Sequence, residues 1–385
     1  MNPMLTWMRI AALAGLCGVS LAARCPAEEA VAPTQVEAPP EASPDEPLAP
    51  EFSALLAAQY LDSAALNWLT THECAACHTM FPYQMARPAL ASVLPVPPQV
   101  RQFFEDIAAG RKVMFPDYLP VDGKASIVVG TAVSLAMNDR FTTGKLHAQS
   151  RKALDEMWSW QRADGSWEWP YRDSPPIKLD EHYGVTFAAI GVGMAPDAYA
   201  QSEAARAGLD RIRHFLAEHP PRSLHEKAML LWASSCVDGL LAADEKTRVL
   251  EELLKCQRPD GGWPLAALVE NLGDARELTE KAAALLAEEG YGKEFAGYQG
   301  QNGVYKVPLT SDGYATGFVV YVARQAGLPA ENEHLRKGVA WLRSNQRASG
   351  RWFTHSIGPP HSRHLISNAG TAYAVMALSA CGEIP

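Results

Sequence analysis

A short segment recurs along this chain and constrains the fold more than any other sequence feature. Each copy consists of the last turn of a predicted helix, a Gln, a glycine turn and a tryptophan, and the clear copies end at Trp167, Trp263 and Trp352. These tryptophans are 96 and 89 residues apart. A weaker copy at residues 301–305 divides the second interval into about 42 and 47 residues. A period of about 40 to 47 residues is the length of a two-helix repeat.

Two kinds of predicted helix alternate around these turns. One kind is amphipathic with a charged face, and the other is apolar almost all round, as is typical of a helix that is buried on several sides. The amphipathic segments are 203–218, 243–254 and 331–344, and the apolar segments are 184–192, 226–240, 313–325 and 368–380. This alternation predicts an all-α fold, a single α/α toroid of about six helical hairpins over residues 51–385, with the apolar helices around a central cavity. We interpret the tryptophans as packing between hairpins and the glutamines as hydrogen-bonding helix ends.

The Gln-x-x-x-Gly-x-Trp turns resemble the QW repeats of the squalene-hopene cyclase and prenyltransferase superfamily, whose fold is an α/α toroid. The resemblance covers residues 51–385 and implies a cavity for an apolar, terpenoid ligand. Triterpene cyclases of this superfamily start their reaction with an Asp-x-Asp-Asp motif, which this sequence does not contain. Protein prenyltransferases use an Asp, Cys and His zinc set, and no matching constellation is found. A divergent terpenoid cyclase without the acid motif remains one of the alternatives.

A second motif, Cys74-Ala-Ala-Cys77-His78, follows the first predicted helix. C-x-x-C-H is the attachment signature of haem c, in which both thiolates bond to the haem and the histidine becomes the proximal iron ligand. When this segment is aligned on the repeat, Cys77 takes the place of the turn glycine and Thr79 that of the tryptophan. We therefore expect haem c to be attached within residues 68–90, as part of one repeat of the toroid.

Two other interpretations of the same cysteines stay open. They could form a disulfide in an oxidising compartment, or they could bind zinc together with His72 and His78. For a haem, the candidates for the sixth iron ligand are Met85 and Met114. A methionine ligand would raise the reduction potential and suit electron transfer, whereas an open position would suit catalysis.

Polar side chains gather where the apolar helices are predicted to begin. The candidates for catalytic roles are Asp180, His182, Asp312 and His364. Helix capping is the ordinary role of an aspartate in such a position. The functional alternative is that these four groups converge beside the haem as proton donors or as a distal ligand.

The N-terminus has the features of an export signal. Arg9 precedes an apolar run that is too short to span a bilayer as a mature helix, and small residues suitable for cleavage follow, so residues 1–23 are predicted to be a signal peptide. Haem c is attached outside the cytoplasm, which agrees with a periplasmic or other extracytoplasmic location. Residues 24–50 are rich in Pro, Ala and Glu and contain no aromatic residue. This composition predicts a disordered linker.

The composition limits the choice of partners. A formal net charge of −9 and a pI near 5.7 argue against nucleic acid, and no second apolar segment is long enough to cross a membrane. We expect an exported haem c protein whose toroid takes an apolar ligand and whose haem exchanges electrons with that ligand or with a redox partner protein. Any enzyme activity would then be that of a haem-dependent oxidoreductase. The alternative is a non-redox binding or scaffold protein with a Cys74–Cys77 disulfide.

Overall fold

The computed structural model describes residues 37–72, 75, 78–111, 121–170, 176–177, 180–269, 295–300, 303–357 and 364–384. The chain divides into two compact units, residues 1–35 and 36–385, and all described residues belong to the second unit. The expected signal peptide, Cys74, Cys77 and Met114 lie outside the described residues.

The described regular structure is almost entirely helical, which confirms the all-α class. One set of helices consists of α1 (Ala54–His72), α3 (Gln99–Ala109), α5 (Ala148–Ser159), α7 (Glu203–Glu218), α9 (Ala243–Lys255) and α13 (Glu333–Ser344). A second set alternates with it along the chain: α2 (Met80–Ala86), α4 (Val121–Thr142), α6 (Glu181–Met194), α8 (Leu224–Cys236), α12 (Gly313–Gln325) and α14 (Ile366–Ala380). Short helices are η1 (Arg87–Leu90), η2 (Tyr199–Gln201) and α10 (Leu265–Val269).

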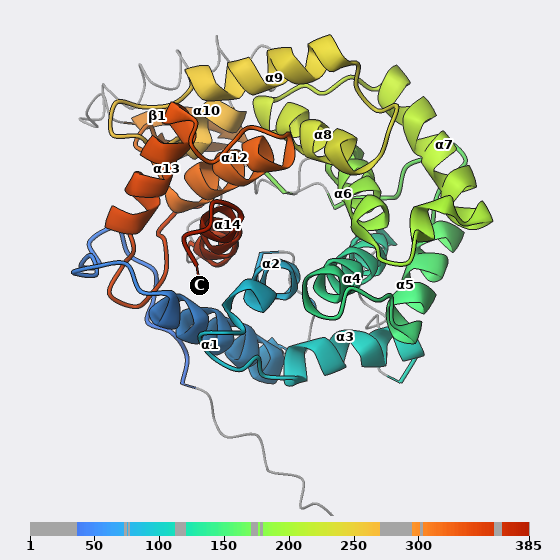
Figure 1. The fold of residues 1–385 in the computed structure, drawn as a ribbon, viewed down its shortest axis with the longest axis horizontal. Coiled ribbons are helices and arrows are strands. Elements are labelled where there is room, and N and C mark those ends of the chain that lie inside the picture. The colour runs from blue at the N-terminus through green and yellow to red at the C-terminus, as the bar shows by residue number, and fades with distance from the viewer. Residues whose placement is uncertain are drawn as a thin grey trace, which may run out of the picture. The chain divides into compact units, whose positions relative to one another are not determined.

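The second set forms an inner row and the first set an outer row (Figure 1). Each inner helix contacts the next one in the order α2, α4, α6, α8, α12 and α14, and α14 contacts α2 again. The outer helices lie against this row, as α5 does on α4 and α9 on α8. Within the described residues, therefore, the contacts between inner helices return to their starting point.

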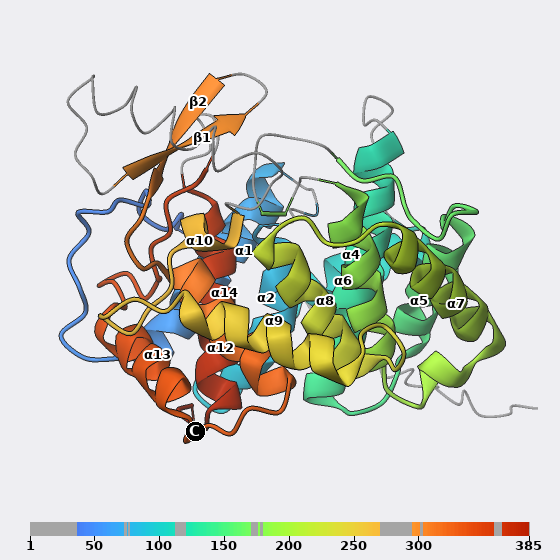
Figure 2. The ribbon, with the colours of Figure 1, turned by 90° about the horizontal axis from the view of Figure 1, so that it is seen from above.

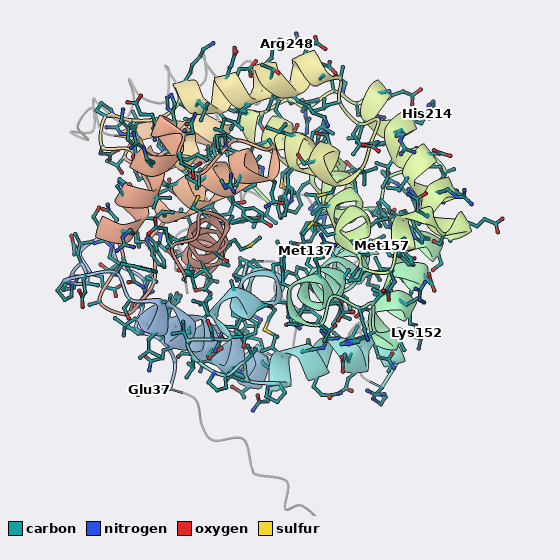
Figure 3. The ribbon with its side chains drawn as sticks, in the orientation of Figure 1. Glu37, Met137, Lys152, Met157, His214 and Arg248 are labelled. Carbon is teal, nitrogen blue, oxygen red and sulfur yellow. The ribbon has the colours of Figure 1, made fainter. Side chains whose placement is uncertain are left out.

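The pattern of apolar residues explains which helices lie inside. Nearly every residue of α14 is buried, whereas α7 buries one stripe from Ala205 to Leu216 and begins at a serine cap, Ser202. Figure 3 shows His214 and Arg248 pointing outward from the outer row, whereas Met137 of α4 and Met157 of α5 are buried inside the fold. None of the described helices combines the length and the apolar character that crossing a bilayer would require.

The three repeat tryptophans each close the end of the preceding outer helix. Nε1 of Trp167, Trp263 and Trp352 donates a hydrogen bond of 2.7 to 2.9 Å to the carbonyl oxygen ten residues earlier, in Met157, Leu253 and Leu342. All three indoles are fully buried. A carbonyl that the helix leaves unpaired is thereby satisfied inside the core.

The three repeat glutamines each join a turn to the next outer helix. Their Nε2 atoms donate both to the carbonyl of the turn glycine and to a carbonyl of the neighbouring hairpin. The neighbouring carbonyls belong to Gly208 in α7 for Gln161, His334 in α13 for Gln257 and Ser53 just before α1 for Gln346. The last of these bonds links residues that are 293 positions apart, and it joins the end of the chain to its beginning.

The weaker copy expected at residues 301–305 is wrong. Residues 303–305 belong to a two-stranded antiparallel hairpin of β1 (Phe295–Gly300) and β2 (Gly303–Pro308), in which Gly300 pairs with Gly303 (Figure 2). Gly303 therefore begins a strand and does not follow the end of a helix.

Folded contacts begin before the expected linker boundary at residue 50. The Glu46 carboxylate lies 2.9 Å from the guanidinium of the buried Arg351 and accepts a hydrogen bond from the backbone of Ser349. Leu48 and Arg347 form an isolated antiparallel bridge. Backbone bonds and one ion pair hold this segment, and a composition poor in aromatic residues does not reveal such contacts. Residues 24–36 of the expected linker lie outside the described residues.

Candidate functional site

The described part of the haem-attachment segment gathers around Trp68 near the end of α1. The ring of His78 lies edge-on to the indole, with ring centres 5.1 Å apart and an angle of 87° between the planes. The ring of His72 stacks on the same indole at 3.9 Å. His78 is half-buried. The two histidines that flank the expected attachment cysteines therefore share one aromatic neighbour, and the cysteines themselves lie outside the described residues.

Thr79 ties this segment to the last inner helix. Nδ2 of Asn368 in α14 donates to the Thr79 hydroxyl at 2.8 Å, and the Tyr60 hydroxyl of α1 donates to the Asn368 amide oxygen at 2.6 Å. All three residues are buried. In the clear repeats, the position of Thr79 is occupied by the buried tryptophan. At this one corner, a polar clamp of Tyr60, Asn368 and Thr79 takes the place of the indole.

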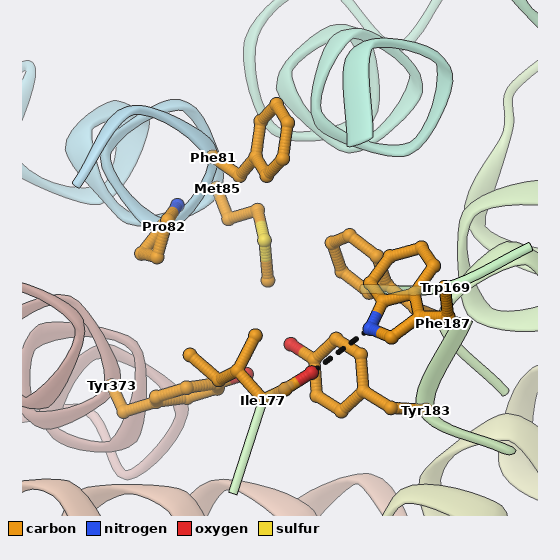
Figure 4. Close-up of a pocket in the computed structure, with 8 residues that line it drawn as sticks. All are labelled: Phe81, Pro82, Met85, Trp169, Ile177, Tyr183, Phe187 and Tyr373. Atoms are coloured by element: carbon orange, nitrogen blue, oxygen red, sulfur yellow. Dashed lines mark hydrogen bonds between the residues drawn. The ribbon is translucent and has the colours of Figure 1, made fainter. Parts of the chain in front are cut away.

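Helix α2 continues from the clamp into the centre of the inner row. All its residues are buried, and it contributes Phe81, Pro82 and Met85 to a central pocket. The opposite wall consists of Trp169, Ile177, Tyr183, Phe187 and Tyr373, and Figure 4 shows the Met85 thioether pointing into the space between the rings. The free volume is about 10 Å³, which is room for about one water molecule.

This pocket is one described feature of the inner row, and the expected central cavity stays a prediction. Gly130 in α4 allows the ring of Phe81 to approach closely, because a methyl group at its Cα would lie 2.1 Å from that ring. Met85 belongs to this central packing, whereas His78 contacts Trp68 near the outer row. Ligation of the iron by Met85 stays a prediction, and Met114 lies outside the described residues.

Asp180 and His182 lie at the start of α6. The Asp180 carboxylate accepts a hydrogen bond from the His182 backbone at 3.0 Å, so its capping role is confirmed, and it also forms an ion pair with Arg222. The His182 side chain is 4% exposed, and neither ring nitrogen has a hydrogen-bond partner among the described residues. Burial, with a smaller contribution from His219, lowers the pKa of His182 to about 4. The imidazole is therefore neutral near pH 7.

A second buried histidine, His225, was not among the residues singled out from the sequence. Its Nε2 is hydrogen-bonded to the Tyr314 hydroxyl at 3.0 Å, and its ring stacks on Phe318 with centres 4.6 Å apart. Burial lowers the pKa of His225 to about 3, and the neighbouring His182 contributes to this shift. The only local signal was a histidine at the start of an apolar helix. The partner, Tyr314, lies 89 residues further along the chain.

Tyrosine hydroxyls extend this polar group toward the central pocket. Burial raises the pKa of Tyr373, and hydrogen bonds with Tyr183 and Tyr314 partly offset that effect. Tyr183 and Tyr373 both line the central pocket. A buried polar chain thus runs from His225 through Tyr314 and Tyr373 to the pocket wall.

Asp312 and His364 lie elsewhere, beside a second pocket. Asp312 caps α12 through a 2.9 Å bond from the Ala315 backbone, and it also accepts bonds from the Leu265 backbone and the Thr354 hydroxyl. Burial raises the pKa of Asp312 to about 6, and these hydrogen bonds oppose the shift. The ring of His364 lies 4.6 Å from that of His355, which lines the same pocket as Asp312.

The four catalytic candidates thus fall into two groups. Asp180 and His182 lie at the start of α6, whereas Asp312 lines the second pocket and His364 lies beside His355, which lines the same pocket. Among the described residues, no group of three or more His, Cys, Asp or Glu side chains has a metal-binding arrangement. In comparisons with known proteins, neither a protein-family model nor a curated protein matches this chain.

Proposed function

We propose that this protein is an exported haem c electron-transfer protein, in which an α/α toroid holds the haem-attachment segment at one of its corners. The observation that carries the proposal is the clamp of Tyr60, Asn368 and Thr79. It holds the residue next to His78 from both the first and the last hairpin, at the place where other corners carry a buried tryptophan.

Two observations support the toroid. The inner helices contact one another in an order that returns to its start, from α2 through α14. The three clear turns also share one set of bonds. Each glutamine joins its turn to the next outer helix, and each tryptophan binds a carbonyl at the end of the preceding outer helix. These features are what the resemblance to the cyclase and prenyltransferase superfamily implies.

The described residues fit a haem bound at this corner. Cys74 and Cys77 would hold it covalently, and His78, which is half-buried beside Trp68, would ligate the iron. When bound, the haem supplies reversible one-electron transfer. The indole of Trp68 limits rotation of the His78 ring, and the Asn368 bond fixes the backbone that follows. A ligand that is held in this way changes little when the charge on the iron changes.

The small pocket beside α2 is not a site for a terpenoid. A pocket for a ligand of that size needs roughly 300 to 1,000 Å³. The central pocket offers about 10 Å³ between the described side chains. We expect the haem to exchange electrons with a partner protein, and the packed inner helices to serve as a rigid support for it.

The absorbance of the full chain, produced with export and haem-attachment machinery, tests this proposal. We expect a Soret band that stays with the polypeptide after acid denaturation and solvent extraction, and that shifts reversibly between oxidised and reduced protein. Changing Cys74→Ser and Cys77→Ser together should remove the retained band. Cys236→Ser is the matched control, because this partly buried thiol of α8 lies outside the motif, and it should leave the band unchanged.

A protein without a Soret band, in which mass spectrometry after alkylation shows a Cys74–Cys77 disulfide, would support the scaffold alternative instead. The sixth ligand can be examined in the same preparation. If Met85 ligates the iron, Met85→Ala should make the reduced protein bind carbon monoxide. Binding of carbon monoxide by the unmodified protein would indicate an open site and would count against electron transfer as the only role.

A further inference from the structure

The second pocket is large enough for a small molecule. It has a volume of about 380 Å³, which lies in the range of ligand sites in proteins. Its walls come from the β2 end, the start of α12, the end of α13 and the loop that follows α13. Its apolar surface includes Leu265, Val307, Trp341 and Phe353. This pocket is thus far roomier than the central one, and it shares no lining residue with it.

Arg347 brings an unused hydrogen-bond donor to this pocket. One terminal nitrogen donates to the Glu46 carbonyl at 2.7 Å, and the guanidinium lies 5.8 Å from the ring centre of Phe353. The edge formed by Nε and Nη2 makes no hydrogen bond among the described residues, and of these two nitrogens Nε is buried. A charged donor that is buried without an acceptor is unfavourable. An anion bound at this edge of the guanidinium would remove that cost.

The carboxylate of Asp312, which also lines the pocket, does not lack hydrogen-bond partners. Asp312 already accepts hydrogen bonds from two backbone N–H groups and from the Thr354 hydroxyl. It is therefore part of the fold, and it gives little reason to expect a bound cation. Among the described lining residues, Arg347 Nε is the buried polar atom that has no partner.

The aromatic walls define the rest of the ligand. Trp341 is 8% exposed and Phe353 is partly exposed, and both line the pocket together with the aliphatic side chains of Leu265 and Val307. Such walls favour a flat or branched apolar body. We propose that the second pocket binds a small aromatic or branched carboxylic acid, with its carboxylate on Arg347 and its apolar body against Trp341 and Phe353. This function goes beyond the electron transfer proposed above.

Calorimetry on the full chain with two matched probes tests the inference. The probes are 2-naphthoate and 2-naphthalenemethanol, which have the same ring system and differ in the charge of the end group. A hydrogen bond to a charged group contributes about 1.5 to 3 kcal/mol, so we expect naphthoate to bind roughly 10- to 100-fold more tightly. Arg347→Gln should remove this preference. Arg343→Gln is the matched control, because Arg343 is an exposed arginine that pairs with Glu383 and does not line the pocket.

Equal affinity for the two probes, no binding of naphthoate, or an unchanged preference in Arg347→Gln would each overturn the proposal. The comparison of probes on the unmodified chain does not depend on whether the Arg347 variant folds. The Soret band is recorded on the same samples. A failure of naphthoate binding with an intact band refutes this inference alone, whereas loss of the band refutes the proposed electron transfer and leaves this pocket untouched.

Discussion

His182 and His225 are buried, neutral imidazoles in the neighbouring helices α6 and α8. Their pKa values are about 4 and about 3 in the folded protein, against an ordinary value near 6.5. Below pH 6.5 the unfolded chain therefore binds protons at these positions while the folded protein does not. Above about pH 6.5 these two histidines do not lower the free energy of unfolding. As the pH falls from 6.5 toward 4, they lower it progressively. Each histidine then lowers stability by about 2 to 3 kcal/mol at pH 4.5.

Replacing His225→Phe should reduce this sensitivity to acid. The phenyl ring can keep the stacking on Phe318, whereas the bond to Tyr314 is lost at every pH, at a cost of about 1 kcal/mol. Urea unfolding followed by circular dichroism at pH 7 and at pH 4.5 measures the difference. The variant should lose about 2 kcal/mol less than the unmodified protein between the two pH values.

The exposed His214 of α7 provides the control for this measurement. His214→Gln should leave the pH dependence as it is in the unmodified protein. If His225→Phe and the unmodified protein show the same difference between pH 7 and pH 4.5, then His225 does not remain neutral in the fold.

At the scale of elements, the glycine turns show how one repeat fixes its neighbour. Gly165, Gly261 and Gly350 all have φ near +93°. A methyl group on any of them would meet a backbone carbonyl of the next outer helix, at 2.1 Å from the Leu56 oxygen in the case of Gly350. Glycine is needed here both for its conformation and for the close approach of two backbones.

Gly350→Ala should therefore destabilise the protein strongly, by about 3 kcal/mol or more. Gly144→Ala is the matched control, because Gly144 has φ of +66° but open space around its Cα. There the conformational cost alone applies, about 1 kcal/mol. Denaturant unfolding of both variants gives the comparison, and equal losses would mean that the contact with Leu56 contributes nothing.

The sequence predicted elements well where the signal was local. The amphipathic period predicts a helix over residues 203–218, which agrees with α7. The tryptophans are buried as expected, but the expected role of the glutamines is wrong. The tryptophan Nε1 atoms bind the carbonyls at the helix ends, and the glutamines instead join each turn to the neighbouring hairpin. The β1–β2 hairpin was missed because the glutamine and glycine in its sequence imitate the repeat. The polar clamp, the His225–Tyr314 bond and the second pocket could not be predicted, because each joins side chains that lie far apart in sequence.

At the scale of the whole molecule, Gln346 links the two ends of the described chain. Its amide oxygen accepts a bond from the Ser53 backbone at 2.7 Å, and its Nε2 donates to the Ser53 carbonyl at 2.9 Å. The ion pair between Glu46 and Arg351 and the hydrogen bond between Tyr60 and Asn368 also join early and late parts of the chain. The inner and outer rows are therefore both closed by contacts between the beginning and the end of the sequence.

Gln346→Ala should loosen the start of α1, although the substitution lies 293 positions away. Hydrogen exchange measured by mass spectrometry should show faster exchange at residues 53–57, with a local loss of about 2 kcal/mol from two partly buried bonds. Gln161→Ala removes the equivalent bonds and should instead affect α7. If both variants showed the same increase in exchange along the whole chain, the two glutamines would not act on the neighbouring segments named here.

The bond between Asn368 and Thr79 also has a consequence for the order of events during biosynthesis. The cysteines of the proposed attachment motif lie near the start of the chain, but Thr79, which follows His78, gains its partner Asn368 only when almost the entire polypeptide has been made. If the chain is exported from its N-terminus as proposed, this bond cannot form until translocation is nearly finished. An enzyme that joins haem to free thiols would then have the whole transit time in which to act.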